Sequence, residues 1–131
     1  MKSSFDILSA LYQIIEPEVE ISGKVIIGEE TMGDQNENVC LNLLNNPIEY
    51  TQQGILNVNV FVMGDNDQRP NMYRMRELVN CIFPLLDNQV HYLEKDEITL
   101  HLKIEDDKGV FKSFENKGKF FYNIRVQFLT L

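Results

Sequence analysis

Cysteine and histidine are scarce in this sequence, with two of each in 131 residues. Cys40 and Cys81 both lie among apolar neighbours, so we predict two buried, reduced thiols rather than a disulfide. Neither His91 nor His101 has cysteines, histidines or carboxylates near it at the spacing of a zinc site. Phosphate-cradling glycine loops and the Gly-x-Ser-x-Gly element are also lacking. We therefore expect no metal site, no cofactor and no catalytic activity.

Long apolar runs are missing as well. No run approaches the roughly 20 apolar residues that a bilayer-spanning helix needs, so we expect no membrane segment. The first residues are interrupted by Asp6, Gln13 and Glu16, which makes them a poor secretory signal. No Asn-x-Ser/Thr acceptor for glycans is present either. These absences favour an intracellular protein.

Basic residues are also fewer than acidic ones. The 12 Lys and Arg residues against 20 Asp and Glu leave a net charge of -8, which argues against a duplex-binding protein. The charges are unevenly placed: residues 16–37 contain seven acids and one base, and residues 108–119 contain four bases and one acid. Either these are two solvated surfaces, or the acidic region of one subunit meets the basic hairpin of its neighbour, head to tail.

What the chain does have is enough apolar residues for one core. Hydrophobic residues make up 44% of the sequence, and no linker divides residues 1–131, so we predict a single domain. Apolar residues recur at three- and four-residue spacing over 3–16, which predicts an amphipathic helix that ends at Pro17. A second such helix is predicted over 70–87, with its final turn distorted by Pro84.

The remaining regular segments read as strands. In residues 54–62, leucine and valines alternate with Asn57 and Asn59. This pattern predicts a strand with one buried face and one face that is exposed to solvent or packed against a partner. The predicted strands are 23–28, 39–44, 54–62, 98–104, a short 110–114 and a long 120–128.

Polar and glycine-containing stretches separate these strands. Residues 29–38 show no periodicity and predict a mobile loop, and Asn45–Pro47 ends the second strand. Asp106–Gly109 and Glu115–Gly118 predict turns. Short hairpin-like connections favour antiparallel pairing. The sequence therefore predicts an α+β fold in α-β-β-β-α-β-β-β order, a mostly antiparallel sheet of about five to six strands with both helices on one face.

Strand 54–62, the Gly/Asp/Pro loop 64–70 and the Met-rich helix that follows resemble a known family. The chain resembles the tail-completion or tail-terminator proteins of long-tailed bacteriophages, small α+β proteins that form rings at the head-tail joint. The resemblance is one of element order, from the helix containing Leu8 to the closing strand 120–128. The family has no catalytic motif to transfer. Loop 29–38 is longer and more acidic than this family leads us to expect.

The resemblance implies a subunit that terminates the tail tube and joins it to the head, typically as a hexameric ring. Its implied partners are further copies of itself, the tail tube and the head-connector proteins. DNA would pass through the ring without specific binding, because an acidic or polar lumen repels phosphates. The protein would then occupy the host cytoplasm during assembly and the virion afterwards.

The candidate contact residues come from the wet strand faces and the two charged regions. They are Glu29, Glu30, Asp34, Glu37, Asn57, Asn59, Lys108, Lys112, Lys117, Lys119 and Arg125. The wet faces, which also include Asn123 and Gln127, could equally be ordinary solvated sheet. Two other functions stay open: a non-catalytic adaptor or regulatory module that binds a protein through the sheet face or an edge strand, and a small enzyme assembled from scattered residues.

Overall fold

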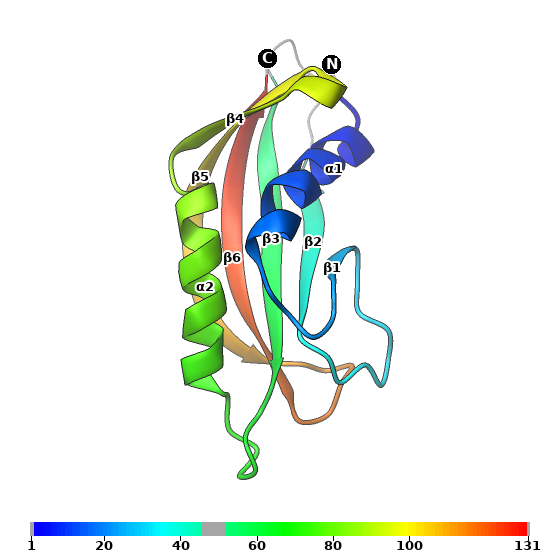
Figure 1. The fold of residues 1–131 in the computed structure, drawn as a ribbon, viewed down its shortest axis with the longest axis vertical. Helices are drawn as coiled ribbons and strands as arrows, with labels where there is room; N and C mark the ends of the chain where they lie inside the picture. Colours follow the sequence, from blue (N-terminus) through cyan, green and yellow to red (C-terminus); the bar gives the residue numbers. More distant parts are fainter. Residues whose placement is uncertain (1, 46–51, 131) are drawn as a thin grey trace.

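The computed structural model describes residues 2–45 and 52–130 as one α+β unit (Figure 1). Its elements are α1 (Ser4–Ile15), the 3-10 turn η1 (Glu16–Glu18), β1 (Val25–Ile27), β2 (Asn38–Asn45), β3 (Gln52–Met63), α2 (Met72–Leu86), β4 (Gln89–Leu93), the 3-10 turn η2 (Glu94–Asp96), β5 (Ile98–Lys112) and β6 (Lys119–Thr130). This confirms the predicted class and element order. The predicted strand end at Asn45–Pro47 lies partly outside the described residues.

The six strands form one sheet in the order β1-β2-β3-β6-β5-β4. Among the strands of the described residues, β1 and β2 pair in parallel, and the other four pairs are antiparallel. The sheet is therefore mixed, and it curls into a half-barrel (Figure 1). The closing strand β6 lies between β3 and β5, so the longest strands occupy the centre.

Both helices begin at a side-chain cap. Ser3 accepts a hydrogen bond from the Asp6 amide while the Asp6 carboxylate accepts one from the Ser3 amide, the reciprocal pattern of a capping box. Asn71 caps α2 through the Arg74 amide. Pro84 lies inside α2, which nevertheless continues to Leu86.

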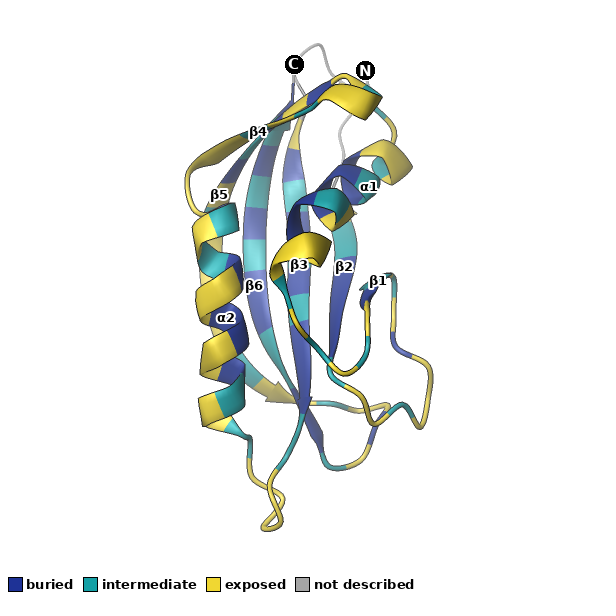
Figure 2. Cartoon of the chain, in the orientation of Figure 1, coloured by how far each residue is buried: buried dark blue, intermediate teal, exposed yellow. Residues whose placement is uncertain are grey.

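Both helices cover the same face of the sheet (Figure 1). The side chains that alternate toward the helices on β3, namely Leu56, Val58 and Val60, are fully buried against them. Figure 2 shows buried and intermediate residues along the central strands, buried residues on the side of α2 that faces the sheet, and exposed residues on the outer helix surfaces. Neither helix, nor any other in the described part of the chain, combines the length and apolar character needed to cross a bilayer.

Two of the strand predictions are wrong in detail. Asp106–Gly109 is not a turn, and 110–114 is not a separate strand, because β5 continues through Asp106–Gly109 to Lys112. It shifts register twice, between Ile104 and Asp106 and between Asp107 and Gly109. Such bulges absorb extra residues without breaking the ladder, and Gly109 supplies a positive φ of 82° there. The additional strand is β4, which the sequence pattern did not predict.

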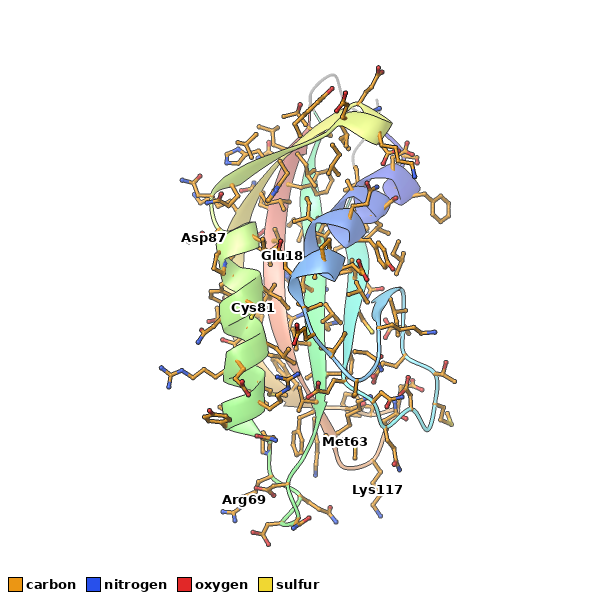
Figure 3. All side chains as sticks on the ribbon, viewed as in Figure 1. Glu18, Met63, Arg69, Cys81, Asp87 and Lys117 are labelled. Atoms are coloured by element: carbon orange, nitrogen blue, oxygen red, sulfur yellow. The ribbon has the colours of Figure 1, made fainter. Side chains whose placement is uncertain are left out.

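The prediction that both cysteines are buried holds only for Cys40. Its side chain is fully buried, whereas Cys81 is exposed. Cys81 lies on the outer surface of α2, beside the buried stripe that includes Leu78 and Ile82 (Figure 3). Burial, reinforced by the negative charge of Glu30, raises the pKa of the Cys40 thiol to about 12.

We therefore expect one reactive thiol per folded chain. Because only the thiolate is nucleophilic, Cys40 should resist a thiol reagent near pH 8 while Cys81 reacts. The reagent should count one thiol in native protein and two after denaturation. Two thiols that react at equal rates in the native protein would contradict the burial of Cys40, and the Cys81→Ser variant identifies which thiol is modified.

Candidate functional site

The sheet face that the helices leave open gathers polar side chains at its centre. Asn57 and Asn59 alternate with the buried residues of β3 and point away from the helices. In the β3–β6 register, Asn57 pairs with Arg125 and Asn59 pairs with Asn123. Three amides and a guanidinium from the two central strands therefore form one patch.

The amides in this patch bond to one another. Asn123 Nδ2 donates to Asn59 Oδ1 at 2.5 Å and lies 3.4 Å from Asn57 Oδ1. Asn123 itself is buried, with 9% of its surface exposed. The carbonyl oxygens of Asn57 and Asn59 accept these bonds, and their amide NH₂ groups donate to no group in the described part of the chain, so both can donate to a partner.

Arg125 is the least satisfied group in the patch. Its Nε atom is buried and has no hydrogen-bond partner among the described residues. A buried donor without a partner costs stability, and an external acceptor would remove that cost. The neighbouring cation, Lys108, lies 2.9 Å from a carboxylate oxygen of Asp106, and both side chains are exposed.

These groups line a hollow of about 420 Å³, which we call the basic hollow. Its lining is Asn57, Asn59, Lys108, Phe111, Phe121, Asn123 and Arg125. The lining contains two cations and no carboxylate, in a chain whose net charge is -8. The hollow therefore suits a partner that is negatively charged or rich in hydrogen-bond acceptors.

An aromatic cluster continues the open face toward the β5–β6 hairpin. The Phe121 ring lies 5.1 Å from the Phe61 ring and 5.5 Å from the Phe111 ring, between centroids. Phe114 is fully exposed beside them. A second hollow, of about 390 Å³, lies here and shares Asn59 and Phe121 with the basic hollow. The two hollows form a continuous surface that is basic on one side and aromatic on the other, where Glu29, Glu30 and Glu115 also belong to the lining.

A buried ion pair closes this end of the open face. The Lys119 ammonium, fully buried, pairs with Glu30 and also donates to the Asp34 carbonyl oxygen at 2.9 Å. Glu30 accepts further bonds from Asn38 Nδ2 at 2.6 Å and Asn116 Nδ2 at 3.2 Å. Residues 29–38, predicted as a mobile loop, are thus tied to the β5–β6 hairpin.

This pairing corrects the predicted subunit contact. Glu30 and Lys119 were predicted to meet the oppositely charged region of a neighbour, but both are buried and meet each other within the chain. Glu37 is occupied in the same way, because Arg74 donates to its two carboxylate oxygens at 2.7 and 2.9 Å. Asp34 accepts bonds from Asn36 and Asn38 of its own loop.

The other predicted contact residues divide into two groups. Asn57, Asn59, Lys108 and Arg125 come together around the basic hollow. Glu29 borders the second hollow, while Lys112 and Lys117 are exposed outside both, Lys117 on the hairpin loop at one end of the molecule (Figure 3).

The aromatic part of the site was not predicted from the sequence, because no phenylalanine is among the predicted contact residues. The signal was present in the strand alternation. Phe121 shares its parity with Asn123 and Arg125, not with the buried Phe120, so it belongs to the open face. Within residues 2–45 and 52–130, no three His, Cys, Asp or Glu side chains gather into a group that could hold a metal ion.

No protein-family model matches this chain, and none of the curated proteins matches it significantly. Function has to be inferred from the geometry of the open face.

Removing one member of the buried ion pair should be costly. Lys119→Met leaves the Glu30 carboxylate buried without its counter-ion, and we expect it to lower the free energy of unfolding by about 3–5 kcal/mol. The double variant Glu30→Gln/Lys119→Met should recover most of that loss. Urea denaturation of the two single variants and the double variant measures the coupling. Strictly additive losses would contradict a direct interaction.

The Arg74–Glu37 pair predicts a pH dependence. Hydrogen bonds from Arg74 hold the pKa of Glu37 below its usual value, more than offsetting the opposing effect of burial. A lowered folded-state pKa contributes stability that is present above the unfolded pKa and is lost as the pH falls through the folded one.

Glu37→Gln should therefore lose stability less steeply than the native protein between about pH 5 and pH 3, as urea midpoints at several pH values would show. The matched control is Glu20→Gln, because the Glu20 side chain is exposed and only its backbone oxygen accepts from Arg74. Parallel curves for native protein and Glu37→Gln would count against the assigned role of Arg74.

Proposed function

We propose that this chain is a structural assembly subunit of a long-tailed phage or prophage, which closes into a ring that terminates the tail tube and joins it to the head. The observation that carries the proposal is the open face of the sheet. That face places amide donors, phenylalanine rings and two cations on one continuous surface, and one of these cations, Arg125, has an unsatisfied Nε. Such a mixture of aromatic, amide and arginine side chains is typical of protein interfaces.

The element order gives independent support. One helix, three strands, a second helix and three strands is the order on which the resemblance to tail-terminator proteins rests, and the chain folds in that order. Both helices are used to cover one sheet face. The other face is thereby left for contact with further subunits, the tail tube or the head connector.

The charge of the chain fits passage of DNA through such a ring. With a net charge of -8, a ring of identical subunits would repel the phosphate backbone rather than hold it. On this proposal the protein acts without catalysis or a cofactor, in the host cytoplasm during assembly and in the virion afterwards.

An adaptor function is the second candidate, and one observation favours it. β4 is an edge strand, and Val90 and Tyr92 on it are 65% and 63% exposed. A partner's strand could add to this edge by main-chain hydrogen bonds and bind over the two side chains. An adaptor of this kind would bind its partner as a monomer.

The two candidates differ in the mass of the particle. A ring-former should yield particles of about six times the 15.3 kDa chain mass, with rotational symmetry in negative-stain images, at high concentration or on isolated tail tubes. Light scattering after size exclusion measures the mass. A protein that stays monomeric at high concentration and beside tail tubes would contradict the ring and favour the adaptor.

A further inference from the structure

We infer that the basic hollow on the open face of one subunit receives the acidic turn Glu16–Glu20 of a second copy of the chain. This inference rests on the proposed ring, and it names the contact that builds it. The occupant is therefore neither an unrelated protein nor a nucleic acid.

Within residues 16–37, the structure leaves few acidic side chains free to make such a contact. Of the seven acids between residues 16 and 37, Glu30, Asp34 and Glu37 accept bonds from groups of their own chain. The carboxylates of Glu16, Glu18 and Glu20 are exposed and have no ion-pair partner among the described residues. Glu29 is exposed as well, but it borders the second hollow on the open face, so Glu16–Glu20 is the free acidic segment of this region on the helix side.

This segment is held in a fixed shape. Pro17 lies within the 3-10 turn η1 and restricts its backbone. Val19 is partly buried against the core, between the exposed Glu18 and Glu20. The buried valine therefore anchors the segment and keeps its carboxylates directed outward. A fixed segment loses less conformational entropy on binding than a flexible one.

The number of cations available for the contact is limited in a similar way. Of the four lysines between residues 108 and 119, Lys119 is buried with Glu30, and Lys112 and Lys117 lie outside the hollows. Lys108 and Arg125 remain on the lining of the basic hollow. Lys108 contacts Asp106 at 2.9 Å, but this ion pair is exposed to solvent and therefore weak, so the ammonium stays available to an incoming carboxylate. The amides of Asn57 and Asn59 add donors for the oxygens of an incoming carboxylate.

The two surfaces lie on opposite sides of the sheet. The turn η1 follows α1 directly, on the helix side, where Glu18 is labelled in Figure 3. The basic hollow is lined by the strand residues that point away from the helices. A single chain cannot bring its own hollow and its own turn together. Each contact between two copies therefore leaves one hollow and one turn of the pair free. Such a heterologous contact repeats from copy to copy and closes into a ring when the rotation allows.

Charge reversal tests this contact. Lys108→Glu, at an exposed position, and Arg125→Glu should each weaken self-association about tenfold or more, measured by sedimentation equilibrium, and Glu18→Lys/Glu20→Lys should do the same. An equimolar mixture of the Lys108→Glu and Glu18→Lys/Glu20→Lys chains should associate again, because every contact in an alternating particle then joins opposite charges.

The matched controls change the same charges elsewhere. Lys117→Glu reverses an exposed lysine outside the basic hollow, and Glu94→Lys/Glu97→Lys reverses two exposed acids in and beside the other 3-10 turn, η2. Both should assemble like the native chain. Far-ultraviolet circular dichroism and thermal unfolding confirm that each variant is folded, and Lys108→Glu decides the outcome if Arg125→Glu does not fold.

The results separate this inference from the proposed function. Native assembly that survives the hollow and turn reversals would overturn the contact and leave the ring standing. A native chain that stays monomeric under all conditions would overturn both. A monomer that binds a single-stranded oligonucleotide through Arg125 would also overturn the contact, because the hollow would then serve a nucleic acid.

Discussion

Two helices on one side of a six-stranded sheet are the constraint from which the other features follow. Strand alternation sends half of the side chains of β3 and β6 toward the helices, where they form the core, and half away from them. The second half must be compatible with water or with a partner. In this chain, the side chains on the open face are amides, cations and phenylalanines. Such side chains tolerate solvent and also offer the hydrogen-bond donors and apolar area of an interface.

The buried Lys119–Glu30 pair decides which charges are left for that interface. It ties loop 29–38 to the hairpin and removes one cation and one acid from the surface. Arg74 removes Glu37 in the same manner. The net effect is a partial separation of free charge, with the carboxylates of Glu16, Glu18 and Glu20 beside α1 and the cations Lys108 and Arg125 on the opposite sheet face, where Glu29 and Glu115 also line the second hollow. Such separation favours contact between copies in one relative orientation, because like surfaces repel.

Most of the fold could be predicted from local periodicity in the sequence. The spacing of apolar residues in α1 and α2 and the alternation in β3 and β6 are properties of short windows, so the elements and the open-face amides could be read from the sequence. What escaped depends on distant partners. Glu30 and Lys119 are 89 positions apart, and the β5 bulges follow from pairing with β6. Cys81 is a different case, because its exposure follows from its position on α2 outside the buried stripe of Leu78 and Ile82.

The central claim is that identical copies meet through the open sheet face. Hydroxyl-radical footprinting of the assembled protein against its dilute, dissociated form tests it most directly. Phe111 and Phe114, which are 45% and 101% exposed in the single chain, should become protected on assembly. Phe5, which is 80% exposed at the start of α1, should be modified equally in both forms. Unchanged modification of Phe111 and Phe114 in a fully assembled sample would contradict the account.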